Sequence, residues 1–104
     1  MSKVAIIAKL TAAEGKRDDL VAALTEHAVA AVADEPGCEI YAPHADTGDE
    51  VTVWFYELYT DGDALAAHGK TEGFAAMGAA LGGLLAGAPE IHVLDPIVAK
   101  GLEL

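Results

Sequence analysis

Apolar residues along the chain follow two spacings, one typical of strands and one typical of helices. Four segments are rich in β-branched and aromatic residues and are predicted strands: residues 3–10, 38–46, 51–60 and a segment from about residue 89. From about residue 18 to 33 apolar residues recur at helical spacing, and Pro36 with Gly37 ends that helix. Residues 61–87 contain a short helix, a Gly-Lys-Thr break and a second helix. The predicted order is therefore βαββαβ.

This order predicts an α+β fold of the ferredoxin-like type, a four-stranded antiparallel sheet with its helices on one face. A sheet face that meets water normally carries a polar residue at every second position. The third strand does not, because Val53 and Phe55 point to one face while Trp54 and Tyr56 point to the other. We therefore expect a second copy of the sheet to cover the open face, in a homodimer built face to face.

Length, charge and cysteine content limit the possible functions. The 104 residues are enough for one domain, residues 1–104, with one core. Six basic against seventeen acidic residues give a net charge of −11, which disfavours nucleic acid and anionic membranes as partners. The single cysteine, Cys38, cannot form an intrachain disulfide, and no apolar stretch suits a signal peptide or a membrane span. We expect a soluble, cytoplasmic protein.

A glutamate in an apolar strand and a histidine on the helix after it are the strongest candidates for chemistry. Glu57 shares a strand face with Phe55 and Tyr59, where a carboxylate is costly unless it is paired. His68 lies on the short helix, which can fold back over the strand. A carboxylate beside an imidazole fixes its tautomer, as a general base near neutral pH requires. A purely structural hydrogen bond between Glu57 and His68 explains the same residues, and both interpretations stay open.

Aromatic and methionine side chains near this pair are candidates for the walls of a pocket that binds a flat aromatic ligand. The predicted pocket residues are Trp54, Tyr56, Tyr59, Phe74 and Met77. Their spacing is also typical of ordinary core packing. The remaining histidines, His27, His44 and His92, are weaker candidates. No His-Glu-x-x-His or comparable spacing is present, so no metal site is predicted.

Three stretches together are typical of one known family: EPGCEIY (residues 35–41), FYELYTDGDALAAH (55–68) and GKTEGF (69–74). On these motifs the chain resembles the antibiotic biosynthesis monooxygenase family, including quinol monooxygenase-like proteins, over residues 3–98. The resemblance implies a dimeric α+β barrel. It also implies an oxygenase that needs neither metal nor flavin and acts on electron-rich aromatics such as quinols or anthrones. The positions carried over are Glu57 and His68, with Tyr56 and Tyr59 as pocket neighbours.

One subgroup of that family is distinguished by residues. Haem-degrading relatives use an Asn on the first strand, a Trp on the short helix and a His four positions after the Phe. The chain has Ala8, His68 and Gly78 there, so haem degradation is not expected. The favoured hypothesis is a cofactor-independent monooxygenase in which His68 is the base and Glu57 orients it. The alternative is a non-catalytic small-ligand-binding or stress-related dimer that uses the same pocket.

Overall fold

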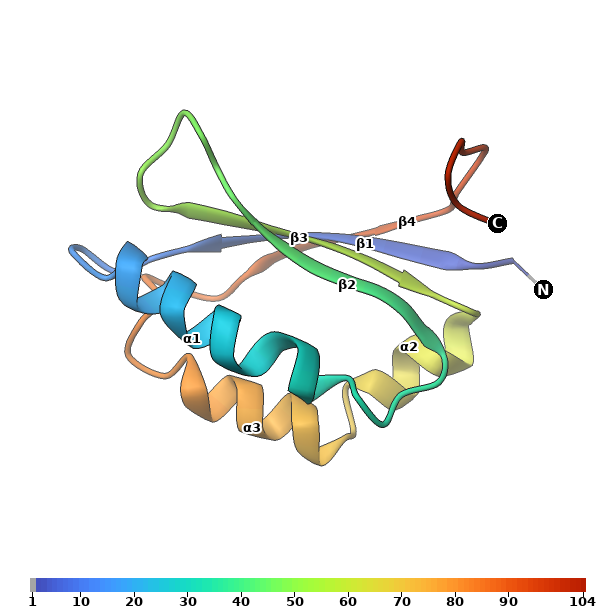
Figure 1. The fold of residues 1–104 in the computed structure, drawn as a ribbon, viewed down its shortest axis with the longest axis horizontal. Helices are drawn as coiled ribbons and strands as arrows, with labels where there is room; N and C mark the ends of the chain where they lie inside the picture. Colours follow the sequence, from blue (N-terminus) through green and yellow to red (C-terminus); the bar gives the residue numbers. More distant parts are fainter. Residues whose placement is uncertain (1) are drawn as a thin grey trace.

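The computed structural model describes residues 2–104 and shows one sheet with three helices on one of its faces (Figure 1). The strands are β1 (Val4–Thr11), β2 (Cys38–Ala45), β3 (Thr52–Tyr59) and β4 (Glu90–Leu94). The helices are α1 (Arg17–Ala31), α2 (Gly62–His68) and α3 (Glu72–Ala80). The predicted α+β, ferredoxin-like order is confirmed. No helix in the described residues is long and apolar enough to cross a membrane.

The four strands lie in the order β2-β3-β1-β4, and every neighbouring pair is antiparallel. Ile6 of β1 lies opposite Glu57 of β3, so Glu57 sits in the middle of the sheet. β4 is an edge strand that ends at Leu94, two residues before Pro96. Because Pro96 lies outside the strand, its missing N–H removes no hydrogen bond from the sheet. The tail after β4 curls on the sheet side away from the helices (Figure 1), and Lys3 Nζ donates to the Glu103 carbonyl at 2.6 Å.

A side-chain cap begins each of the two short helices, α2 and α3. The Asp61 side chain accepts a hydrogen bond from the Ala64 backbone N–H at 2.8 Å. Thr71 Oγ1 accepts from the Phe74 N–H at 2.9 Å. Each cap of this kind contributes about 1 kcal/mol to helix stability. The break at residues 69–71 lets His68, at the end of α2, approach Phe74, at the start of α3, with ring centroids 5.2 Å apart.

The core lies between the helices and one face of the sheet, which we call the inner face. Its buried members come mainly from the two central strands and two helices: Ile6, Ala8, Leu10, Ala12, Val53, Phe55, Tyr59, Leu20, Leu24, Ala28 and Met77. On α1 the buried residues recur every fourth position and end at Ala28, not at His27. The His27 side chain is instead 45% exposed, next to Glu26. His27 therefore lies outside the buried face of α1.

Candidate functional site

A cavity of about 320 Å³ lies between the inner face of the sheet and helices α2 and α3. Its walls are largely apolar and come from all four strands and both helices; they include Ala8, Tyr41, Phe55, Leu65, Phe74, Met77, Leu81 and Ile91. Glu57 and His68 are the two lining side chains that can carry charge near neutral pH, and both are at least nine-tenths buried. A mainly apolar cavity with a few convergent polar groups is the usual form of a small-molecule site.

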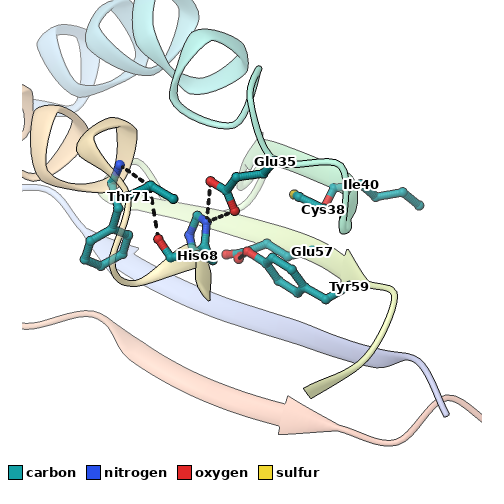
Figure 2. Close-up of polar contacts among 8 residues, drawn as sticks. Glu35, Cys38, Ile40, Glu57, Tyr59, His68 and Thr71 are labelled. Atoms are coloured by element: carbon teal, nitrogen blue, oxygen red, sulfur yellow. Dashed lines mark hydrogen bonds and ion pairs between the residues drawn. The ribbon is translucent and has the colours of Figure 1, made fainter. Parts of the chain in front are cut away.

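His68 is held by a carboxylate that the sequence analysis did not select. Nδ1 of His68 lies 2.9 Å from Oε1 and 3.0 Å from Oε2 of Glu35, and both side chains are 8% exposed (Figure 2). A carboxylate can only accept, so Nδ1 carries the proton in this pair. The predicted orienter, Glu57, makes no hydrogen bond to His68 in the described residues. Glu35 takes that place, and the prediction is corrected here.

The turn that carries Glu35 packs directly on α2. α1 ends at Ala31, and Glu35 lies with Pro36 and Gly37 in the turn that follows, where the Cys38 N–H donates to the Glu35 carbonyl at 3.1 Å. A Cβ atom added at Gly37 would lie 2.5 Å from Cβ of Ala64, so only glycine allows this approach. Ala64 and His68 are four residues apart and share one face of α2. The close contact at Gly37 therefore brings Glu35 to His68.

Glu57 has a different partner. The hydroxyl of Tyr59, two residues along the same strand face, donates to Oε1 of Glu57 at 2.5 Å (Figure 2). Burial raises the pKa of the Glu57 carboxyl above its ordinary value, although the Tyr59 hydrogen bond and nearby His68 oppose that rise. Burial and the hydrogen bond to Glu57 also raise the pKa of Tyr59. Tyr59 is fully buried and holds Glu57 by this hydrogen bond, but it does not line the cavity.

Two hydrogen-bonding atoms at this end of the cavity are free. No side chain in residues 2–104 bonds to Nε2 of His68 or to Oε2 of Glu57. In that same part of the chain, no buried side-chain nitrogen or oxygen is without a partner. Both atoms must therefore reach the open space of the cavity. With Nδ1 protonated, Nε2 of neutral His68 presents a lone pair to a ligand, as a general base must.

Aromatic rings surround the imidazole. The ring centroids of Tyr41, Tyr59 and Phe74 lie 5.5, 5.3 and 5.2 Å from that of His68. Tyr41 also packs on Phe55 at 5.0 Å. Phe74 and Met77 line the cavity, where the sequence analysis expected them. Tyr41 and Glu35 were not selected, although both belong to the EPGCEIY motif, which was the signal that could have identified them.

Trp54 and Tyr56 do not line this cavity. Strand side chains alternate between faces, so these two residues point away from the helices, opposite to Phe55 and Glu57. Nε1 of Trp54 donates to Oδ2 of Asp46 at 2.8 Å, and Lys9 Nζ lies 5.8 Å from the Trp54 ring centroid. The expectation that they form pocket walls is corrected, because the helices cover only the inner face.

The weaker candidates lie elsewhere. His44 is exposed opposite Trp54 on β2, and His92 is exposed beside Glu90 on β4. Burial raises the pKa of the Cys38 thiol to about 11, which keeps the sulfur protonated and poorly nucleophilic. Among residues 2–104, no group of three or more His, Cys, Asp or Glu side chains is arranged to hold a metal ion.

Sequence comparison identifies the family to which this fold and cavity belong. The family model described as antibiotic biosynthesis monooxygenase matches residues 3–80, three quarters of the chain. The chain belongs to the antibiotic biosynthesis monooxygenase family. The matched region of this family includes β1 to β3 and both helices that build the cavity, with Glu35, Glu57 and His68.

Solved structures agree with this membership in the antibiotic biosynthesis monooxygenase family. A candidate antibiotic biosynthesis monooxygenase from Caulobacter crescentus CB15 is 34% identical, with 93% of this chain and 92% of that chain covered and a TM-score of 0.84. A similar candidate from Chloroflexus aurantiacus J-10-fl is 27% identical, with 98% of this chain and 100% of that chain covered and a TM-score of 0.80. SnoaB, a cofactor-independent oxygenase from Streptomyces nogalater, is 18% identical and shares the fold. The alignment covers 98% of this chain and 100% of SnoaB, with a TM-score of 0.80. No functionally curated protein shows significant similarity.

Proposed function

We propose that the protein is a cofactor-independent monooxygenase that oxidises a small, electron-rich aromatic hydroxyl compound or anthrone with O₂. One observation carries the proposal: a buried Glu35–His68 pair leaves the Nε2 lone pair of His68 open to a cavity with aromatic walls. Quinols and anthrones react with O₂ once they are deprotonated, so a positioned base in a site that excludes water is the main requirement. Membership of the family, and the fold shared with a cofactor-independent oxygenase, support the same reaction type.

In the proposed reaction the substrate supplies all the electrons. His68 Nε2 takes its acidic proton, and the anion transfers one electron to O₂. The radical pair combines into a carbon–oxygen bond, and the peroxide anion recovers a proton from His68. His68 then removes the remaining proton on that carbon as the O–O bond breaks. The hydroxide takes that proton from His68 and leaves as water, which restores the neutral imidazole.

Oxygen-dependent turnover by the wild-type protein tests this function. Metal-stripped protein in chelator is mixed with a panel of quinols and anthrones, with and without O₂, and O₂ uptake and product are measured. We expect uptake above the uncatalysed rate, and one atom of isotopically labelled O₂ in the product. Ligand-induced thermal stabilisation without turnover across the panel would contradict the oxygenase and favour the non-catalytic ligand-binding dimer.

We also propose that two copies of the chain form a homodimer through the outer face of the sheet, which is the face opposite the helices. Ile7, Trp54 and Tyr56 are half-buried on that face and, with His44, line a shallow apolar hollow that no helix covers. An exposed apolar patch of this kind is typical of a protein interface. We expect a dimer in analytical ultracentrifugation at micromolar concentration, and a monomer for Tyr56→Lys. Val29→Lys, on the exposed surface of α1, is the matched control and should stay dimeric. A monomeric wild-type protein would contradict the interface.

A further inference from the structure

The basic side chains of the protein all lie away from the cavity. None of the six lysine and arginine residues contributes to its lining. Lys3 pairs with Glu39, and Lys16 lies near Asp19. Lys9 lies over Trp54 on the outer face, while Arg17 donates to the backbone carbonyls of Asp46 and Asp49. Lys70 and Lys100 are exposed. No lining side chain with a fixed positive charge is therefore available to a bound anion.

The polar end of the cavity presents hydrogen-bond acceptors. Oε2 of Glu57 is free, Nε2 of His68 is free, and the carboxylate of Glu35 lies directly behind the imidazole. Tyr41 adds a hydroxyl, and its raised pKa, caused mainly by burial, keeps that hydroxyl neutral. These groups can accept a hydrogen bond from a phenolic O–H, and Tyr41 can donate to a neutral oxygen.

An anionic substituent would be poorly tolerated in such a site. A carboxylate or phosphate that enters the cavity loses its hydration, and that loss is large unless a cation or several donors replace the water. The Glu35 carboxylate, and Glu57 where it is ionised, add like-charge repulsion. The net charge of −11 lowers the local concentration of anions further. An uncharged aromatic ring with an O–H group meets none of these penalties.

From this we infer that the cavity selects uncharged hydroxylated aromatic compounds and excludes their carboxylated or phosphorylated analogues. The inference rests on the same cavity as the proposed oxygenase and defines its substrate class by charge. The hydroxyl enters first, toward Nε2 of His68 and Oε2 of Glu57, and the ring lies against Phe55, Phe74 and Met77. Substrates that carry a carboxylate to steer them into a basic site belong to a different type of pocket.

Binding of three matched probes tests the inference without any turnover. 2-Naphthol, 6-hydroxy-2-naphthoate and its methyl ester are stable in air, and the ester has the size of the acid without its charge. Calorimetric titration at neutral pH should show binding of 2-naphthol and the ester, and binding of the acid at least about tenfold weaker than the ester. Equal or tighter binding of the acid would overturn the inference. Failure of all three probes to bind would overturn it too.

Two charge variants locate the cause. Leu81→Arg places a cation in the cavity wall, and we expect it to reduce the preference for the ester over the acid by about tenfold. Val29→Arg makes the same change in net charge on the exposed surface of α1 and should leave the preference unchanged. Equal effects of both variants would assign the selectivity to overall charge and overturn the role of the cavity. Should Leu81→Arg fail to fold, Glu57→Gln is expected to reduce the same preference.

The two proposals fail separately. Selective probe binding with no O₂-dependent turnover would contradict the oxygenase and leave the charge selectivity standing. Turnover of a carboxylated quinol at the rate of its ester would contradict the charge selectivity and leave the oxygenase standing.

Discussion

Replacement of His68 by alanine is expected to reduce O₂-dependent turnover by about 100- to 10,000-fold, the usual contribution of a positioned general base. In the proposed reaction Nε2 of His68 takes the first proton from the substrate, and no second imidazole or amine side chain among residues 2–104 lines the cavity. The apolar walls remain, so binding of an uncharged aromatic should change much less than kcat. Initial rates of O₂ uptake, with circular dichroism to verify the fold, measure the effect.

Glu35 should act through His68 as a positioning residue. Glu35→Gln keeps the side-chain volume, but an amide no longer holds Nδ1–H specifically, because its NH₂ can donate to Nδ1 and reverse the tautomer. We expect kcat to fall while KM changes little, and the loss to be smaller than in His68→Ala because the imidazole is still present. Glu35→Asp, which retains the carboxylate, should recover part of kcat. A merely structural role would lower stability in both variants without this split.

His27→Ala is the matched control for both substitutions. His27 lies half-exposed on α1 and outside the cavity, so its removal tests for a general effect of losing an imidazole. Its turnover should equal that of the wild type. Full activity in His68→Ala would remove His68 from the mechanism, whatever the control shows.

The second large effect concerns stability and pH. Glu57 has a higher pKa in the folded protein than its ordinary value of 4.5, mainly because it is buried. The ordinary value is that of the unfolded chain. At a pH between the unfolded and the folded pKa, the folded chain holds more protons than the unfolded chain, so the free energy of unfolding falls as pH rises. The stabilising contribution of the protonated carboxyl is complete below pH 4.5 and is lost as pH rises through the folded pKa. The slope from one such group is at most about 1.4 kcal/mol per pH unit.

Glu57→Gln is expected to abolish this fall in the free energy of unfolding with rising pH. Glutamine cannot ionise, and its carbonyl oxygen can still accept the hydrogen bond from Tyr59. The free energy of unfolding of both proteins is measured in urea from pH 4 to pH 8. The value for the variant minus that for the wild type should increase as pH rises. Parallel curves for the two proteins would contradict a raised pKa at Glu57.

Glu39→Gln supplies a control of opposite sign. The hydrogen bond from Lys3 lowers the pKa of the exposed Glu39 carboxyl, so the contribution of that group is lost as pH falls through its folded pKa. For Glu39→Gln, the free energy of unfolding of the variant minus that of the wild type should therefore decrease as pH rises, opposite to Glu57→Gln. The same trend in both variants would indicate an effect of net charge alone.

The sequence predicted the strands and helices well because their patterns are local. Residues 51–60 were expected as a strand and form β3 (Thr52–Tyr59); residues 18–33 were expected as a helix and form α1 (Arg17–Ala31). The Gly-Lys-Thr break was expected between two helices, and it separates α2 from α3. Each of these features depends on side-chain type within a few residues, which a single sequence contains.

The candidate site was predicted only in part. Glu57 and His68 were singled out because a glutamate in an apolar strand and a histidine on the next helix break the pattern around them. The partner of His68 was missed because Glu35 is 33 residues away in the chain. Several acidic side chains could have supplied the carboxylate, and apart from membership of the EPGCEIY motif nothing in the sequence distinguishes Glu35 from the others.

The sequence by itself therefore determined the order of elements, the family and the two polar residues that face the cavity. It also determined that Trp54 and Tyr56 lie on the opposite strand face from Phe55 and Glu57, since strand side chains alternate. Only the tertiary structure decided which of these faces the helices cover, because both are apolar and packing alone distinguishes them. It also decided the Glu35–His68 pair, because the contact of Gly37 with Ala64 joins two segments whose proximity no local pattern specifies.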